Sequence, residues 1–406
     1  MSAAEQFVKL CGEVGNYTEK LTGVSVVDAY TGPKELHPKN QSVDKTSEEL
    51  VHVIHETFDS IRDEIHDSLR FEYMMGELHS LNTVVDWLSG KELSYAQLVE
   101  GLFHIELKQF PENEIDESIQ LLESRISDFP GTSLLDKVTR FGSEGEITGN
   151  DLKILIEKEL QPKSEEVGKL FRDRVFSQMG SSVPDKGVQY EAVQNQPWSG
   201  YNWYQGGFRS LNQFNIDAKF NKDTLLNVIY HEYEHHVSNL WREKAYLNSQ
   251  ELELSIVPLH TGRCVISEGT ADTAKEFLGV VDDSPRMRVV EALNVLRRTT
   301  SINAAIKLNA EGCSVDDAVD YLVNRGLRTE ESAKQSINFI SPTTKDGSIN
   351  FFAPYIFTYF TGRTEFVLPM YNKAVEQDVL SEFFKTVYMN PYSGSSVTWN
   401  KAFEWM

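Results

Sequence analysis

The chain has 406 residues, a formal net charge of −22 and a hydrophobic content of 40%. This composition is ordinary for a globular protein with a buried core, and the negative charge argues against binding to the phosphate backbone of nucleic acids. The three cysteines are widely spaced and predict no disulfide framework, which favours a reducing cytosol. Because the sequence shows no signal-peptide pattern and no transmembrane run, we expect a cytoplasmic protein that binds neither nucleic acid nor membrane.

The first 185 residues carry mainly helical patterns and no chemical motif. Apolar residues recur at helical spacing between Leu50 and Tyr73, and the stretch Ser94-Tyr95-Ala96-Gln97 has the form of a capping box. Residues 1–40 are mixed in pattern. Helices are predicted over 46–88 (one or two), from Ser94, from Glu112 to Pro130-Gly131, over 150–159 and over 164–179. We expect residues 1–185 to form one helical wall of a cleft.

An aromatic stretch follows, with Gly206-Gly207 near its centre. Aromatic residues on both sides of a Gly-Gly pair predict a β-hairpin. The open edge of such a hairpin could pair with an extended peptide, and the alternative is a hairpin that only covers the core. The aromatic residues before the pair are Tyr190, Trp198, Tyr201, Trp203 and Tyr204, and Phe208 follows it.

The strongest chemical pattern is the H-E-x-x-H motif formed by His231, Glu232 and His235. Apolar residues precede it at helical spacing, and Asn221 or Asp223 can cap the helix that they predict. Since about one helical turn separates the two histidines, both imidazoles leave the same face and can bind one Zn²⁺. Glu232 would then point toward a metal-bound water.

A second helix, predicted from about Thr261, supplies the remaining candidates. Glu268 is the candidate third ligand, because zinc hydrolases usually take three protein ligands and keep one position open. Asp272, four residues later, could accept the outer N–H of a ligand histidine. We therefore expect one Zn²⁺ per chain. Cys264 is expected to be a small buried residue behind the ligand, with a fourth metal ligand or a redox switch as the alternative.

The C-terminal region is predicted to form further helices, and one of them is rich in aromatic residues. Tyr355, Tyr359 and Arg363 share a face of that helix at spacings of four residues. This face supplies candidate donors to an oxyanion, and core packing is the alternative for each tyrosine. Arg363 could instead hold a terminal carboxylate. The predicted helices span 286–309, 314–323, 330–340 and 351–374, and residues 382–406 are predicted to form one helix, a loop and a last short helix.

The predicted chemistry is metal-assisted hydrolysis. Zn²⁺ lowers the pKa of its water, and Glu232 accepts the proton and passes it to the leaving amine. His236 faces elsewhere on the motif helix and is expected to be structural rather than functional. His260 is expected at the surface, with a contact to substrate as the alternative.

The pattern of His231-Glu232-x-x-His235, Glu268 and Asp272 resembles the gluzincin metallopeptidases. The helical framework, the aromatic hairpin and the late tyrosine helix are similar to the helical gluzincins related to thimet oligopeptidase, angiotensin-converting enzyme and the thermostable carboxypeptidases. A bacterial family of helical zincins, known as a domain of unknown function, is more similar still over roughly residues 190–400. The stretches that carry this second likeness are 309–314 (NAEGCS), 318–322 (AVDYL) and 359–362 (YFTG).

The resemblance implies zinc ligands at His231, His235 and Glu268, a general base at Glu232 and a transition-state tyrosine at Tyr359. The chain also departs from the bacterial family. That family often carries an insertion in its zinc motif followed by Pro-Gly, and it tends to carry an Asp and a His where this chain has Ala305 and Asn309. These departures bear on the identity of the substrate rather than on the zinc site.

We therefore predict a mainly α protein, a large gluzincin-type helical body with a deep cleft and one small β-hairpin or sheet beside the motif helix. Residues 186–406 would form the catalytic region, either separate from residues 1–185 or continuous with them. The predicted function is a zinc metallopeptidase for short peptides, with a carboxypeptidase mode included. The alternatives are a zinc amidohydrolase for a non-peptide amide and a non-catalytic metal-binding protein of the same fold.

Overall fold

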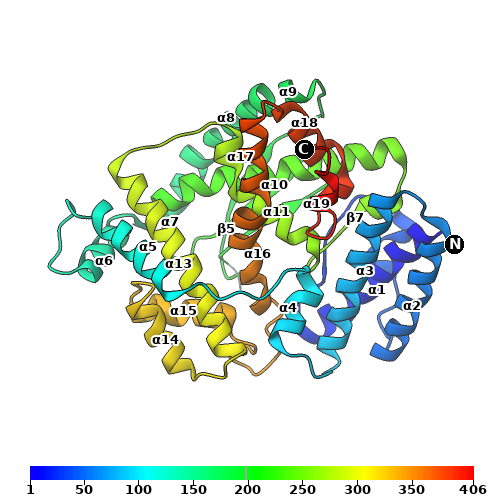
Figure 1. The fold of residues 1–406 in the computed structure, drawn as a ribbon, viewed down its shortest axis with the longest axis horizontal. Helices are drawn as coiled ribbons and strands as arrows, with labels where there is room; N and C mark the ends of the chain where they lie inside the picture. The colour runs from blue at the N-terminus through cyan, green and yellow to red at the C-terminus, as the bar shows by residue number, and fades with distance from the viewer. Residues whose placement is uncertain (197–198) are drawn as a thin grey trace.

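The computed structural model describes residues 1–196 and 199–406, so the predicted hairpin residue Trp198 lies outside the described residues. The fold is mainly α, as predicted. Figure 1 shows α10 and α11 near the centre of the molecule, with α1–α3 at one end and α5, α6, α14 and α15 toward the other. Within the described ranges, no helix combines the length and apolar character needed to cross a membrane.

The N-terminal half is helical, and two of its helices, those over residues 3–22 and 134–144, were not predicted from the sequence. The first helix begins with a capping box in which Ser2 and Glu5 satisfy each other's backbone N–H groups. This S-x-x-E pattern and the apolar residues Phe7, Val8, Cys11 and Val14, which are buried at helical spacing, could have predicted the helix. The helices are α1 (Ala3–Thr22), α2 (Ser47–Glu64), α3 (Ser68–Leu88), α4 (Tyr95–Phe103), α5 (Glu112–Arg125), α6 (Leu134–Glu144), α7 (Gly149–Leu155), α8 (Gln161–Phe171) and α9 (Ser177–Met179).

The C-terminal half contains the long motif helix and the helices around it. The single helix predicted over 351–374 is interrupted, because Pro369 lacks a backbone N–H and a π-helical stretch (Gly362–Val367) precedes it. The helices are α10 (Lys222–Ser249), α11 (Gly262–Asp272), α12 (Ala274–Phe277), α13 (Pro285–Asn309), α14 (Val315–Asn324), α15 (Glu330–Ile340), α16 (Ile356–Thr361), α17 (Leu368–Glu376), α18 (Leu380–Phe384) and α19 (Trp399–Ala402).

The predicted hairpin is present and belongs to a three-stranded sheet. Strands β4 (Gly200–Tyr204) and β5 (Ser210–Asn215) pair antiparallel around the Gly-Gly turn, and β3 (Val188–Val193) adds to β5 in parallel. Strand β4 is an edge. Asn202 lies directly opposite Asn212, so both side chains leave the same face of the sheet. Two smaller sheets join β1 (Val27–Tyr30) to β7 (Ile256–Pro258) and β2 (Glu146–Ile147) to β6 (Phe220–Asn221).

Each hydrophobic core combines residues from before and after residue 185. The rings of Phe171 and Tyr233, for example, stack with centroids 5.8 Å apart. Ile115 and Leu296 share another core, and Phe7 and Phe357 share a third. The hydrophobic packing is therefore continuous across residue 185. The division into a region 1–185 and a catalytic region 186–406 stays a prediction.

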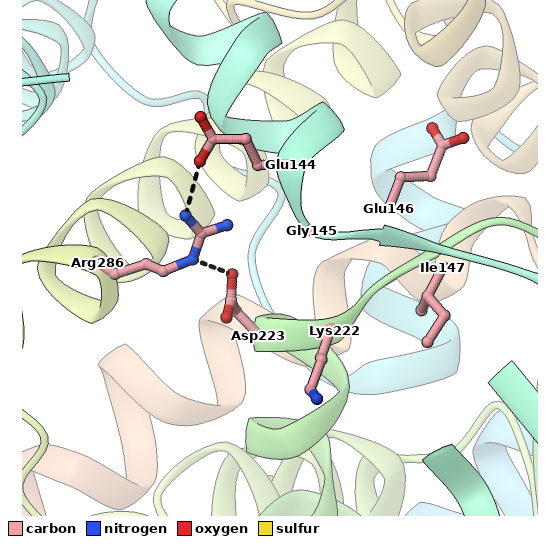
Figure 2. Close-up of a pocket in the computed structure, with 7 residues that line it drawn as sticks. All are labelled: Glu144, Gly145, Glu146, Ile147, Lys222, Asp223 and Arg286. Atoms are coloured by element: carbon pink, nitrogen blue, oxygen red, sulfur yellow. Dashed lines mark hydrogen bonds and ion pairs between the residues drawn. The ribbon is translucent and has the colours of Figure 1, made fainter. Parts of the chain in front are cut away.

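The start of α10 is anchored to its neighbours. The side-chain oxygen of Asn221 caps the helix by accepting hydrogen bonds from the backbone N–H groups of Asp223 and Thr224. Arg286 on α13 donates to Asp223 at 2.6 Å and to Glu144 on α6 at 3.1 Å, at the side of a hollow of about 300 Å³ (Figure 2). These bonds tie three helices together at the end of α10 that precedes the histidines.

Candidate metal centre

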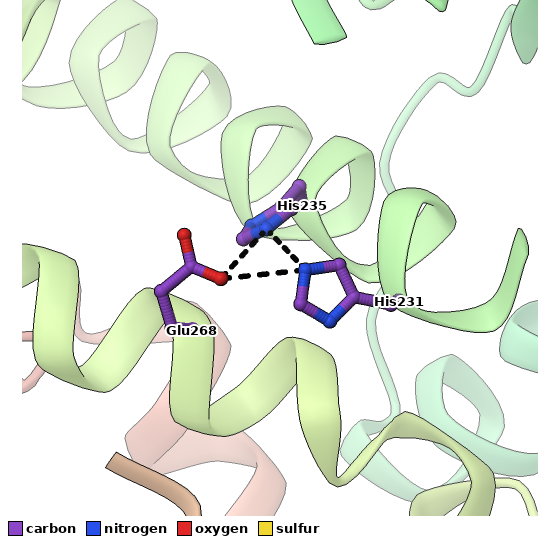
Figure 3. Close-up of side chains that lie close together, drawn as sticks. All are labelled: His231, His235 and Glu268. Atoms are coloured by element: carbon purple, nitrogen blue, oxygen red, sulfur yellow. Dashed lines mark hydrogen bonds and ion pairs between the residues drawn. The ribbon is translucent and has the colours of Figure 1, made fainter. Parts of the chain in front are cut away.

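Helices α10 and α11 lie side by side and bring the three predicted metal ligands together (Figure 3). His231 and His235 project from α10 toward Glu268 on α11. Their Nε2 atoms are 3.1 Å apart. Oε2 of Glu268 lies 3.3 Å from Nε2 of His231 and 3.6 Å from Nε2 of His235. One ligand atom from each of the three residues therefore lies within 4.8 Å of the other two.

The converging atoms fit a single transition-metal ion. Ligand atoms at zinc–nitrogen and zinc–oxygen bond lengths from one tetrahedral ion are separated by about 3.3 Å, close to the separations found here. Oε2 of Glu268 is buried and has no hydrogen-bond partner among the described residues. Its nearest polar neighbours are the two imidazoles, and a buried carboxylate costs free energy unless a cation, either a metal ion or a protonated histidine, balances its charge. Two imidazoles and one carboxylate suit Zn²⁺.

The outer nitrogen of each histidine has its own partner. Nδ1 of His231 lies 2.8 Å from Oδ1 of Asp272, and Nδ1 of His235 lies 3.2 Å from Oγ of Ser267. Arg298 on α13 donates to both oxygens of Asp272 and keeps that carboxylate in place. With Nδ1 held in this way, the Nε2 lone pair of each imidazole is directed to the centre of the cluster.

The charges around the ligands favour a cation. Burial acts to raise the pKa of Glu268, but His235 and His231 outweigh it and hold the pKa of this carboxyl well below its usual range. Burial acts to lower the pKa of His231, but hydrogen bonds with Asp272 and Glu268 outweigh it and raise this pKa well above its usual value. A metal ion would take the place of the protons on these imidazoles.

The two tyrosines of the predicted C-terminal helix have different positions. Tyr355 is buried, and its hydroxyl donates to Oε1 of Glu268 at 2.9 Å. The ring of Tyr359 lies 5.6 Å from that of Tyr355, centroid to centroid. Burial and then the charges of Glu268, Asp272 and Glu232 raise the pKa of Tyr359. Within the described part of the chain, no hydrogen bond holds the Tyr359 hydroxyl.

Arg363 lies on the same predicted helical face as Tyr355 and Tyr359, but its side chain bonds to Glu276 and to the backbone of Asp272 instead of a metal ligand. Its guanidinium pairs with the carboxylate of Glu276 at 2.6 Å and donates to the backbone carbonyl of Asp272 at 2.6 Å. Arg363 therefore stabilises the end of the ligand helix. Its contact with a substrate carboxylate stays a prediction.

The remaining candidates, His236, His260 and Cys264, are buried in the protein interior. His236 is buried between Oγ of Ser210, at 2.8 Å, and Asp185, at 3.1 Å. The surface position expected for His260 is wrong, because this residue is fully buried and its Nε2 lies 2.7 Å from the carbonyl of Phe351. Cys264 is buried, as predicted.

Glu232 follows the candidate ligand His231 directly on α10. Its carboxylate accepts a hydrogen bond of 3.2 Å from the side chain of Asn202 on the edge strand β4. It also lines a cavity of about 320 Å³ between α10 and the sheet. An acid–base group at the edge of a cavity is placed to reach a bound substrate.

Sequence reasoning missed three residues of this arrangement. Ser267 stands beside a predicted ligand, and its polar side chain on a helix was an available signal. Arg298 and Asn202 come from elements that are close to the site only in the folded chain, and no local pattern marks either of them.

No protein-family model matches the chain, and no curated protein matches it. Among solved structures, a "putative lipoprotein" from Colwellia psychrerythraea is similar in fold, with a TM-score of 0.54 and 14% identity over 96% of this chain and 68% of that chain. A "putative lipoprotein of unknown function" from Shewanella oneidensis has a TM-score of 0.49 and 10% identity, over 89% of this chain and 74% of that one. At 14% identity, the similarity to the Colwellia protein shows a shared fold and does not extend to function.

Proposed function

We propose that the protein is a zinc-dependent hydrolase of the gluzincin type that cleaves peptide bonds. The observation that carries the proposal is the convergence of His231, His235 and Oε2 of Glu268, next to Glu232, which lines a cavity. A site that only stored metal would not need a carboxylate in the position of a general base. The non-catalytic alternative is therefore the weaker one.

The side chains have separate roles in this proposal. His231, His235 and Glu268 hold the metal, which when bound supplies a Lewis acid that activates water and polarises a carbonyl. Glu232 accepts the proton of the attacking water and delivers it to the leaving nitrogen. Tyr359 donates a hydrogen bond to the developing oxyanion. Tyr355 positions Glu268 and does not touch the substrate.

A peptide suits the site better than a small non-peptide amide. The edge strand β4 lies beside Glu232, since Asn202 donates to both the carboxylate and the backbone carbonyl of that residue. An exposed strand edge can hold an extended peptide by main-chain hydrogen bonds. We propose the cytosol as the location, which the free cysteines Cys11, Cys264 and Cys313 support.

The deciding experiment compares the wild type with Glu232→Gln. Bound zinc is measured by metal analysis, and hydrolysis is measured with a library of fluorogenic peptides. We expect about one zinc per chain in both proteins and a loss of cleavage of at least about a hundredfold in the variant. Glu165→Gln, at an exposed position on α8, is the matched control and should behave as the wild type.

The alternatives predict other outcomes. Cleavage by Glu232→Gln at the full rate would contradict the mechanism. Zinc binding without hydrolysis of any peptide would favour the amidohydrolase or the non-catalytic protein, which a panel of non-peptide amides separates. His231→Ala should lose the metal, and one zinc per chain in this variant would show that the ligands are elsewhere.

A further inference from the structure

Two arginines meet where α13 packs against α14 and α15 (Figure 1). Arg297 lies on α13, and Arg328 lies in the loop between α14 and α15. Nη2 of Arg297 donates to the carbonyl of Leu327 at 3.4 Å, and Nη2 of Arg328 donates to the carbonyl of Arg297 at 3.3 Å. Nη2 of Arg328 also donates to Oγ of Ser301 at 3.0 Å. Each guanidinium thus bonds to the other's segment, and the two positive charges lie close together.

This pair of cations has no counter-charge among the described residues. No carboxylate lies within ion-pair distance of either guanidinium in residues 1–196 and 199–406, although the chain has 61 acidic residues against 39 basic ones. Burial lowers the pKa of Arg297 to about 10. Burial, together with the charge of Arg297, lowers the pKa of Arg328 to about 9. Since arginines taken out of water are normally paired with an acid, the pair lacks an anion.

The acids nearest in the chain do not balance the pair. Glu330 and Glu331 begin α15 just after the loop, but both are exposed, and Glu330 pairs with a lysine one turn later. Asp272 pairs with Arg298, the residue after Arg297 on α13. Successive side chains of a helix point about 100° apart, so this carboxylate faces another direction. The arginine pair is therefore also separate from the metal centre.

A ligand can reach the pair from outside. Both arginine side chains are only partly buried. The Nε atom of each is enclosed and has no hydrogen-bond partner in the described part of the chain. The Nη1 atom of each also has no hydrogen bond to a described residue, but it retains accessible surface. The two Nη1 atoms can therefore donate to a bound anion while the Nη2 atoms keep their bonds to the protein.

We propose that Arg297 and Arg328 form a binding site for a phosphoryl group, either inorganic phosphate or a phosphate monoester. A phosphoryl dianion balances two positive charges, whereas one carboxylate would leave a guanidinium uncompensated. Its several oxygens can accept from both guanidinium groups, and the planar N–H arrangement of arginine matches them. The site does not depend on the proposed hydrolase activity.

The test is calorimetry with inorganic phosphate on the zinc-loaded protein, at about pH 8 and constant ionic strength. We expect about one phosphate per chain at this site, and at least about tenfold weaker binding in Arg297→Met and in Arg328→Met. Arg125→Met, at an exposed position on α5, removes the same charge and should bind as the wild type. Because a metal ion can also take a phosphoryl oxygen, the titration is repeated with His231→Ala, which should retain the phosphate.

Two further ligands define the chemistry of the site. Phenyl phosphate that binds at least as tightly as phosphate would assign the site to monoesters, and weaker binding would assign it to the free anion. Acetate that binds as tightly as phosphate would overturn the phosphoryl assignment. No binding to the wild type, equal phosphate affinity in the wild type and both methionine variants, or loss of the phosphate in His231→Ala would overturn the site.

Urea unfolding separates an anion site from a purely structural role. A bound anion stabilises the native state, so phosphate should raise the unfolding midpoint of the wild type more than that of Arg328→Met. The difference between the two proteins is the measure, because phosphate also stabilises proteins nonspecifically. Equal rises in both would show that the arginines only bond to carbonyls. If the methionine variants do not fold, Arg328→Lys decides, since it keeps the charge and loses the planar donor group.

Discussion

The hydroxyl of Tyr355 donates a hydrogen bond of 2.9 Å to Oε1 of Glu268. This bond occupies one carboxylate oxygen and leaves the other, Oε2, facing His231 and His235. The tyrosine therefore determines the orientation of a ligand without being a ligand. Outer partners of this kind typically change metal affinity by ten- to a hundredfold.

Replacing Tyr355 with Phe should weaken zinc binding about tenfold while the fold is retained. The carboxylate would lose the hydrogen bond that fixes its rotamer and would have to be reordered on binding. Competition with a chromophoric chelator measures the affinity. An unchanged zinc affinity in this variant would show that Glu268 is held in place by packing alone.

Tyr359→Phe should behave differently from Tyr355→Phe. Because the Tyr359 hydroxyl has no partner among the described residues, its loss should leave zinc affinity within about twofold of the wild type. Loss of an oxyanion donor should lower kcat by about a hundredfold and change KM little. Steady-state kinetics on a cleaved peptide measures both constants. A variant with normal kcat would remove Tyr359 from the mechanism.

Asp272→Asn should reduce zinc affinity by about ten- to a hundredfold. The carboxylate accepts the Nδ1 proton of His231 and pairs with Arg298, and a neutral amide weakens both interactions. Ser267→Ala removes the corresponding, longer contact to His235 and should cost less. Chelator competition on the two variants gives the order of their affinities, and the opposite order would contradict the roles assigned to these partners.

Gly362→Ala should destabilise the protein by about 2 kcal/mol or more and weaken metal binding. A Cβ at this position would collide with the backbone carbonyl of Val265, because the C-terminal end of α16 crosses α11 at close range near Gly269. Relief of the collision would move the tyrosines away from Glu268. Gly142→Ala in α6 is the control, since its Cβ would meet no atom within 4 Å. Urea unfolding measures both, and equal stabilities would contradict the close approach.

Glu77→Gln should remove a pH dependence of stability. Glu77 is fully buried, and burial raises the pKa of its carboxyl from 4.5 to about 7, against the opposing effects of Thr261, Arg263 and Arg242. The native state therefore holds this proton more tightly than the unfolded state. Its contribution is complete below pH 4.5 and is lost as the pH rises through 7, a decrease of up to about 3 kcal/mol in the free energy of unfolding.

Urea unfolding between pH 5 and 8, a range that includes the pKa of Glu77 in the folded protein, tests this expectation. The stability of the wild type should fall across the range more steeply than that of Glu77→Gln. The exposed Glu100→Gln on α4 should show the slope of the wild type. Parallel slopes in Glu77→Gln and the wild type would show that Glu77 is ionised throughout.

Much of the fold and part of the site followed from local patterns. The apolar period and the Asn221 cap predicted the motif helix, and a spacing of four residues placed His231 and His235 on one face. The capping box at Ser94 and the Gly206-Gly207 turn were equally local, and both elements are present. Each of these features depends on backbone geometry within a few residues, which the sequence specifies directly.

The sequence by itself determined the pair of histidines, but only the tertiary structure decided what surrounds them. Tyr355, Tyr359 and Arg363 share one helical face, yet the first bonds to Glu268, the second packs its ring against that of the first, and the third pairs with Glu276. The difference arises because α16 crosses α11 at a point of close backbone contact. That crossing depends on the packing of residues far apart in the chain, so no spacing along one helix can specify it.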